Sequence, residues 1–338
     1  MKVTDKLNKV HCMNWLDNSL PDKCAKLIIA DPPYYKVKGD FDFIWKTFED
    51  YLKDVEKWAV ECKRVLADNG TILWYGDAKN IAYAQIIFDK YFNLLSNITC
   101  HIYDRQTNKI TTEDARTFIS TTERVLMYGN KLDDKMFDDF YHDTVRKSIE
   151  PTHKYLNLLI TRNELAEKLL NVGNCKNIAS AKQNANNILK QTSAKPQFIT
   201  EFQYNLIDAD KKTYEELRKE YEELRKEYEE LRKEYEELRR PFNPTEKYKM
   251  DVLRVSQEGH ITGNYDHDTV KPEKLTRILI TTCSRENDLV IVPFAGSGTE
   301  CSMSAKEGRE FIGYDIEQKY VDMANKRVET HISQTRMF

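Results

Sequence analysis

The chain of 338 residues is long enough for one large domain or two modest ones. Its 40% hydrophobic and 32% charged residues fit a soluble globular protein, and the net charge of −3 gives no overall nucleic-acid footprint. No stretch reaches membrane-spanning length and the start has no apolar signal-peptide core, so we expect a cytoplasmic protein without a membrane partner. Seven scattered cysteines, without a C-x-x-C pair or clustered histidines, predict reduced thiols and no metal site.

Strands and helices alternate over the first 130 residues. The sequence predicts a short N-terminal strand, a buried strand over 26–30, a helix over 44–66, and a strand over 71–75 after a turn at 68–70. A helix over 79–91 and strands over 94–103 and 124–128 follow. This alternation indicates βαβ units and a mostly parallel sheet with helices on both faces, which is a Rossmann-like α/β fold.

The strand over 26–30 ends at the turn Asp31-Pro32-Pro33-Tyr34. Two consecutive prolines stop both this strand and any following helix, so the turn holds a carboxylate where open α/β sheets bind ligands. An acid, a carbonyl in a segment without an N–H donor and a flat ring together suit a planar molecule that carries an amino group. A polar turn with Tyr34 packed locally is the alternative that these residues leave open.

The alternation stops near residue 130, and the region 151–205 is predicted to be helical. Thr161 and Glu164 form a capping box, Gly173 ends that helix, and another helix runs over 176–190. The region carries seven Lys/Arg against three Asp/Glu, so it is locally positive. The region can be interpreted as an ordinary helical insertion or as a nucleic-acid reader. The second interpretation is supported because Asn and Gln can bond adenine edges. The candidate DNA contacts are Lys176, Lys182, Gln183, Asn184 and Asn187.

Residues 214–240 repeat the heptad Tyr-Glu-Glu-Leu-Arg-Lys-Glu three times and then add six related residues. Tyr occupies the a positions and Leu the d positions, which is typical of a coiled coil. Each full heptad carries three Glu against one Arg and one Lys, so the repeat holds the whole net charge of −3. The pattern predicts either a homodimer formed through this helix or a solitary exposed helix that acts as a spacer.

The α/β pattern resumes over 272–330, with predicted helices over 273–283, from 300, and over 317–329, and strands over 289–292 and 310–314. The turn Phe294-Ala295-Gly296-Ser297-Gly298-Thr299 lies between a strand and a helix, where glycine lets a ligand approach the backbone. Asp315 follows the next strand, where an acid bonds ribose hydroxyls in nucleotide-type sites. Together they predict a nucleotide-like cofactor at this edge.

The D-P-P-Y turn, the F-x-G-x-G turn and Asp315 together resemble the amino-group DNA methyltransferases that use S-adenosylmethionine. The catalytic motif comes first, an insert follows and the cofactor motif comes last, which resembles the circularly permuted β class of that family. His267, Lys271 and Pro272 match an H-x-x-x-K-P element before the cofactor strand. The resemblance implies a permuted methyltransferase fold with a catalytic half (1–145), a helical target-recognition insert (146–213), a heptad-repeat helix (214–240) and a cofactor-binding half (241–338).

The resemblance also implies an activity, the transfer of a methyl group from S-adenosylmethionine to N6 of an adenine flipped out of double-stranded DNA. Asp31 and the Pro32 carbonyl would accept the two amino hydrogens, and Tyr34 would stack on the base. The implied setting is a bacterium or phage, with a cognate restriction endonuclease as partner or with no partner. Cytosine-N4 methylation and a catalytically silent DNA-binding protein are the alternatives.

Two positions depart from the family pattern. Members usually carry an acid at the position of Val292, and often another at the position of Cys12, where it faces the cofactor adenine. The loss of one polar contact weakens binding by about 1–3 kcal/mol. The sequence therefore predicts an active enzyme with a weakened affinity for its cofactor.

Overall fold

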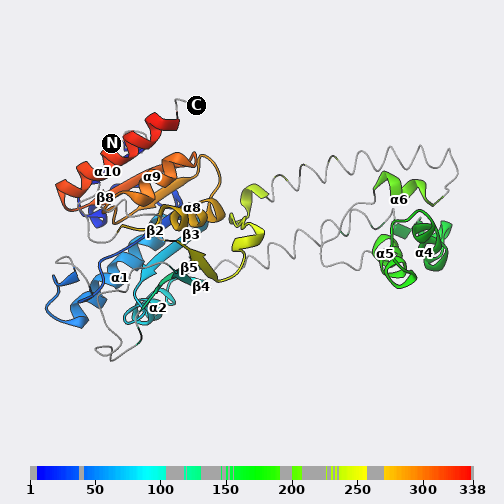
Figure 1. Cartoon of the computed structure of the whole chain (residues 1–338), viewed down its shortest axis with the longest axis horizontal. Coiled ribbons are helices and arrows are strands. Elements are labelled where there is room, and N and C mark those ends of the chain that lie inside the picture. The colour runs from blue at the N-terminus through cyan, green and yellow to red at the C-terminus, as the bar shows by residue number, and fades with distance from the viewer. Residues whose placement is uncertain are drawn as a thin grey trace. The chain divides into compact units, whose positions relative to one another are not determined.

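The computed structural model describes residues 6–37, 42–103, 118, 120–130, 146, 150, 153–154, 156–190, 200–207, 226, 230, 233, 236–256 and 270–335. The chain forms two compact units, unit 1 from Met1–Leu132 and Arg240–Phe338, and unit 2 from Asp133–Arg239 (Figure 1). All seven cysteines are free thiols. None of the helices in the described part of the chain has the length and apolarity of a membrane span.

Unit 1 is built on an eight-stranded sheet with the order β1-β8-β7-β2-β3-β5-β4-β6. The strands are β1 (Lys9–Cys12), β2 (Ala25–Ala30), β3 (Leu66–Gly76), β4 (Asn93–Ile102), β5 (Thr122–Gly129), β6 (Val252–Val255), β7 (Leu289–Val292) and β8 (Glu310–Asp315). Within this sheet β5 alone runs antiparallel to its neighbours, β3 and β4. The predicted α/β fold is confirmed.

Helices cover both faces of the sheet (Figure 1). One face carries α1 (Phe48–Val65) and α2 (Ile81–Phe88), and the other carries α8 (Glu273–Cys283), α9 (Thr299–Lys306) and α10 (Gln318–Thr335). Successive side chains of β2 alternate between them: Ile28 and Ala30 pack with α1, whereas Leu27 and Ile29 pack with α8 to α10. Both faces are therefore buried, which explains why the strands read as continuous apolar runs.

The predicted elements differ from the structure mainly at their ends. The helix expected over 44–66 begins at Phe48, because Thr47 caps it by accepting a hydrogen bond from the backbone of Asp50. β3 begins at Leu66 and includes the segment 68–70 that the sequence predicts as a turn. Its pairing with β2 shifts register there, so the segment bulges while the strand continues. β6, with four residues, is not predicted, and α10 extends beyond the predicted end.

Unit 2 has a small helical core of its own. Its helices are α4 (Arg162–Asn171), α5 (Ile178–Lys190) and α6 (Glu201–Asn205). The predicted capping box is present: the hydroxyl of Thr161 accepts from the Glu164 N–H, and the Glu164 carboxylate accepts from the Thr161 N–H at 2.8 Å. Apolar residues from α4 and α5 form one buried cluster. Most of the predicted heptad helix, 214–240, lies outside the described residues.

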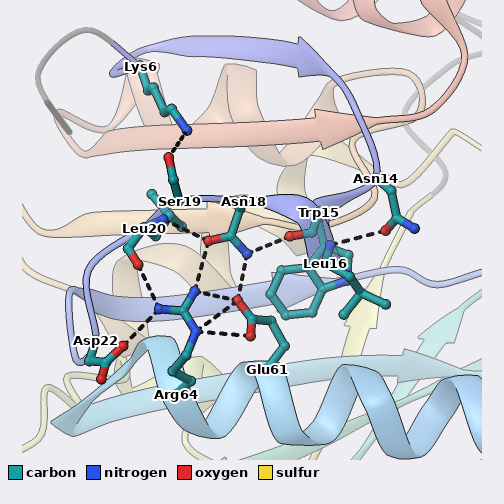
Figure 2. A network of polar contacts seen from close by, with 10 residues as sticks. All are labelled: Lys6, Asn14, Trp15, Leu16, Asn18, Ser19, Leu20, Asp22, Glu61 and Arg64. Atoms are coloured by element: carbon teal, nitrogen blue, oxygen red, sulfur yellow. Dashed lines mark hydrogen bonds and ion pairs between the residues drawn. The ribbon is translucent and has the colours of Figure 1, made fainter. Parts of the chain in front are cut away.

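A polar network ties the segment between β1 and β2 to α1 (Figure 2). Nη1 of Arg64 donates to the Leu20 carbonyl at 2.7 Å and to Asp22 at 2.8 Å. Nη2 of Arg64 donates to Oδ1 of Asn18 at 3.0 Å and to Glu61 at 2.5 Å. Asn18 also donates to Glu61, at 2.6 Å. The network fixes the entry to β2, the strand that leads to the D-P-P-Y turn.

Candidate active site

Three adjacent strands bring the predicted motifs to one edge of the sheet. In the sheet order β8, β7 and β2 are consecutive, with Val292 paired to Gly313 and Ile291 paired to Ile28. The three strands are parallel, so their carboxyl ends lie at the same edge. Asp31 follows β2, the Gly-rich turn follows β7, and Asp315 ends β8. The D-P-P-Y turn and the two cofactor motifs therefore lie on neighbouring strands.

Both carboxylate oxygens of Asp31 have partners. The Tyr34 hydroxyl donates to Oδ1, and Nζ of Lys271 lies 2.8 Å from Oδ2. The Lys271 side chain is only 6% exposed, and its Nζ lies 3.7 Å from Oε2 of Glu123. Burial opposes the charged form, but Asp31 and Glu123 outweigh it and raise the pKa of Lys271. The sequence predicts Lys271 at the cofactor, and in the structure its ammonium group pairs with Asp31.

The two tyrosines of the turn point to opposite faces of the sheet. The Tyr34 ring packs against the cluster on the α8 to α10 face, and burial, followed by the charge of Asp31, raises the pKa of its hydroxyl. The Tyr35 ring packs on the other face, with its centroid 5.2 Å from that of Phe48. Buried Asp42 holds the turn by accepting a hydrogen bond from the Tyr34 N–H at 2.5 Å. The turn is thus anchored on both faces.

The Gly-rich turn is bonded directly to Asp315. The Gly296 N–H donates to Oδ2 of Asp315 at 2.9 Å, and the Ala295 N–H donates to the Tyr314 carbonyl at 2.8 Å. Gly298 has a φ of 75°, and a Cβ there would lie 2.6 Å from Cα of Ala324 in α10. Glycine is therefore required at 298 both by backbone conformation and by the close approach of α10.

Other residues of the turn have mainly structural contacts. The Phe294 ring packs edge-on against Trp58, with centroids 5.0 Å apart. Nη1 of the buried Arg327 donates to the Thr299 hydroxyl at 2.7 Å and to the Ser297 carbonyl at 3.2 Å. Nη2 of Arg327 forms an ion pair with Glu273 at 2.7 Å. These contacts hold the turn between the sheet, α8 and α10.

The sequence did not single out three groups near Asp31, namely the buried Tyr75 and Glu300 and the half-buried Glu123. Burial, followed by the charge of Asp31, raises the pKa of Glu300 to about 7. Burial, followed by the charge of Glu300, raises the pKa of Tyr75 well above its usual value. Within the described part of the chain, Oε1 of Glu300 and the hydroxyl of Tyr75 have no hydrogen-bond partner. In the sequence, Glu300 could have been recognised as an acid directly after the Gly-rich turn, at the start of a buried helix.

The remaining predicted residues lie in different places. His267 lies outside the described residues, and Pro272 directly precedes α8. In unit 2, Lys176, Gln183 and Asn184 are exposed, whereas Lys182 and Asn187 are half-buried. All five lie on α5 or just before it. The side chains that the sequence proposes for DNA contact therefore lie on or beside one helix.

The fold and this edge define an α/β protein with a nucleotide-type cofactor site. The chain belongs to the N6_N4_Mtase family of DNA methylases, whose model matches residues 25–326. The resemblance stated from the motifs is thereby confirmed at the level of the family. S-adenosylmethionine, which the sequence predicts as cofactor, is the methyl donor that this membership supports.

Individual relatives match over very different lengths. The orphan methyltransferase M.BamHII from Bacillus amyloliquefaciens is 41% identical over 68 residues, 20% of this chain and 26% of the relative. The type II methyltransferase M1.MboII from Moraxella bovis is 22% identical over 329 residues, 95% of this chain and 96% of the relative. The match to M.BamHII and three further relatives spans only 18–26% of their lengths.

The chain is also similar to a solved structure described as a DNA modification methylase from Thermus thermophilus. The two share 15% sequence identity and a TM-score of 0.49, over 96% of this chain and 95% of the other.

Proposed function

We propose that the protein transfers a methyl group from S-adenosylmethionine to N6 of an adenine extruded from double-stranded DNA. The observation that carries the proposal is the Asp31 carboxylate, which follows β2 at the sheet edge that also carries the Gly-rich turn and Asp315. Family membership supports methyl transfer to DNA. In the family that the motifs resemble, D-P-P-Y is commonest among adenine-N6 enzymes, which favours adenine over cytosine.

Oxygen acceptors of the D-P-P-Y turn would activate the amino group. An exocyclic amine is a poor nucleophile because its lone pair is delocalised into the ring. The Asp31 carboxylate and the Pro32 carbonyl accept its two hydrogens, favour a tetrahedral nitrogen, and leave Asp31 placed to take the proton that the nitrogen sheds. Pro33 keeps the turn stiff.

The amino group has to replace a donor that already occupies Asp31. Tyr34 donates to Oδ1, and Lys271 lies 2.8 Å from Oδ2. We propose that the Tyr34 hydroxyl gives way, because the ring can then stack on the extruded base and offset part of its unstacking cost. Lys271 keeps a second carboxylate, Glu123, at 3.7 Å.

The buried groups near Asp31 fit the proposed cofactor. When bound, S-adenosylmethionine supplies an electrophilic methyl group on a positively charged sulfur. Unpartnered polar atoms on Tyr75 and Glu300, and an excess of carboxylates over ammonium groups, fit a cationic ligand. Asp315, already bonded to the Gly296 N–H, is our candidate for the ribose hydroxyls. The residues we propose to hold the cofactor are Phe294, Ala295, Gly296, Ser297, Gly298, Thr299, Asp315, His267, Lys271 and Pro272.

We also propose that the insert 146–213 selects the DNA target and that the two flanking halves are joined in the permuted β-class order. Polar side chains on or beside α5 support this, since Gln183 and Asn184 are exposed. Lys182→Glu should weaken DNA binding and lower the slope of log affinity against log salt by about 1. Lys154→Glu, on another helix of unit 2, is the control. Equal effects of the two changes would place the reader elsewhere.

A single assay tests the proposed reaction and its alternatives. Purified protein is incubated with S-adenosylmethionine and DNA, the DNA is digested to nucleosides, and the methylated base is identified by mass spectrometry. We expect N6-methyladenine, and loss of the product in Asp31→Ala. N4-methylcytosine would show the cytosine reaction instead. No methylated base would indicate a DNA-binding protein without catalytic activity.

Two partner predictions remain from the sequence. The heptad segment 214–240 is proposed to act as a dimer contact or as a spacer, and a cognate restriction endonuclease is proposed as a functional partner of a cytoplasmic, DNA-associated enzyme. Deletion of the two heptads Tyr214–Glu227 tests the first prediction. Light scattering should then show a dimer for the full chain and a monomer for the deletion. Identical masses would assign the repeat to a spacer role.

A further inference from the structure

Glu300 is a buried acid whose hydrogen bonding is incomplete. It is the second residue of α9, directly after the Gly-rich turn, and is 4% exposed. Its Oε1 atom has no hydrogen-bond partner among the residues that the structure describes. A buried carboxyl oxygen of this kind can accept a hydrogen bond from a ligand, which would lower the cost of its burial.

The charges around Glu300 favour a cationic ligand. Among the described residues, three carboxyl groups, those of Asp31, Glu123 and Glu300, raise the pKa of the buried ammonium group of Lys271. Arg327 also acts on Glu300, but this guanidinium already forms an ion pair with α8 at 2.7 Å. The group therefore has more negative than positive charge, and a ligand with positive centres would balance it.

Glu300 also lies near the position where the family usually carries an acid. Val292 is buried in the hydrophobic cluster on the α8 to α10 face of the sheet. Among the described residues, Glu300 is the charged group that most raises the pKa of the Tyr75 hydroxyl, and no hydrogen-bond partner of that hydroxyl is found there either. Val292 ends β7 just before the Gly-rich turn and Glu300 lies at the start of α9 just after it, so the two positions flank the same turn, and Val292 itself offers no polar group.

We infer that Glu300 binds the α-ammonium group of S-adenosylmethionine and so replaces the acid that is missing at Val292. This inference rests on the proposed function, since it assigns one end of the proposed cofactor. The ammonium group donates to the free oxygen of Glu300 and balances part of the excess negative charge. The contact of Glu300, in α9, then compensates for the weaker cofactor affinity that the sequence predicts from Val292.

Calorimetric titration of the purified protein at neutral pH tests this assignment. Glu300→Gln should weaken the affinity for S-adenosylmethionine by about 10- to 100-fold, the range for a lost hydrogen bond to a charged group. It should leave unchanged the affinity for 5′-methylthioadenosine, which lacks the amino-acid part. Glu307→Gln, at the other end of α9, is the matched control and should bind both ligands as the wild type does.

Several outcomes would overturn the inference. One is an unchanged affinity of Glu300→Gln for S-adenosylmethionine, and another is an equal loss for both ligands, which indicates damage to α9. If the variant does not fold, the wild type is titrated with S-adenosylhomocysteine and its desamino analogue. The amino compound should bind at least about 10-fold tighter, and equal affinities overturn the inference. A wild type that binds neither cofactor nor product overturns the proposed function as well.

Discussion

At the scale of single residues, two glycines at opposite ends of α9 have the same backbone conformation and different surroundings. Gly298 and Gly308 have φ values of 75° and 73°. A Cβ at 308 would lie 3.8 Å from the nearest atom, on Glu286, whereas one at 298 would lie 2.6 Å from Ala324. Gly308→Ala should cost about 1–2 kcal/mol for the backbone alone. Gly298→Ala should cost about 2 kcal/mol more, because α10 has to move.

Urea denaturation of both variants measures this difference as a shift of the unfolding midpoint at constant slope. Gly308→Ala is the control for backbone strain, since it leaves the packing intact. Equal midpoints for the two variants would contradict the contact between Gly298 and α10.

The carboxyl group of Glu300 should make stability depend on pH. Burial raises its pKa from 4.5 to about 7, against the opposing charges of Lys271 and Arg327. The folded protein thus holds this proton more tightly than the unfolded chain does. The resulting stabilisation is complete below about pH 4.5 and is lost as the pH rises through about 7, a difference of about 3 kcal/mol.

Glu300→Gln removes this titration. The free energy of unfolding of the variant, relative to that of the wild type, should therefore increase as the pH rises from about 5 to about 8. Denaturation without ligand, repeated across this range, measures the gain. Glu307→Gln is the control for the loss of an acidic side chain next to α9. Parallel curves for Glu300→Gln and the wild type would show that Glu300 does not titrate there.

The sequence placed Asp31, Gly296 and Asp315 correctly at one sheet edge, because each lies at the end of a clear apolar strand. It could not place Lys271 on Asp31, since that pairing joins segments far apart in the chain and has no local signal. The sequence also missed Glu300, whose importance comes from burial and from the missing partner of Oε1. Local motifs therefore predict where the site residues lie along the chain. The charges that surround Asp31 depend on tertiary packing and cannot be predicted in this way.

At the scale of elements, Arg64 of α1 bonds the segment that leads into β2 (Figure 2). Removing its side chain should therefore weaken the attachment of this segment to α1. Arg64→Ala deletes the donors to Leu20, Asn18 and Asp22, and leaves the mostly buried carboxylate of Glu61 without its cation. We expect a loss of about 2 kcal/mol in the free energy of unfolding. Thermal denaturation measures this loss.

Lys57→Ala on the same helix is the control, because its pair with Asp54 is a surface ion pair worth about 0–1 kcal/mol. A similar shift in melting temperature for both variants would show that the network adds little beyond an ordinary surface charge.

Element types were more predictable than strand directions. The sequence predicted the positions of β7 and α8 because both have strong apolar patterns with clear ends. The antiparallel direction of β5 is set by its pairing with β3 and β4, which composition does not encode. β6 is too short for a periodic signal, and it adds to the sheet beside β4.

At the scale of the whole molecule, the chain leaves unit 1 and returns to it at adjacent points, before and after unit 2. A Cβ at Gly129, the end of β5, would lie 3.6 Å from Cδ of Arg240, where unit 1 resumes. Among the described residues, neither hydrophobic core cluster of unit 1 includes a residue of unit 2. Unit 2 has a hydrophobic cluster of its own. Replacing Asp133–Arg239 with a short glycine-serine linker should therefore preserve one cooperative unfolding transition of unit 1.

The same replacement separates cofactor binding from DNA recognition. The shortened protein should keep the wild-type affinity for S-adenosylmethionine, because the proposed cofactor residues all belong to unit 1. It should lose most of its DNA affinity at moderate salt, because the positive region 151–205, which we propose as the DNA reader, is removed with it. Calorimetry and a DNA-binding titration measure the two quantities on one preparation. Retained DNA affinity would assign recognition to unit 1, and lost cofactor affinity would show that the insert supports the active site.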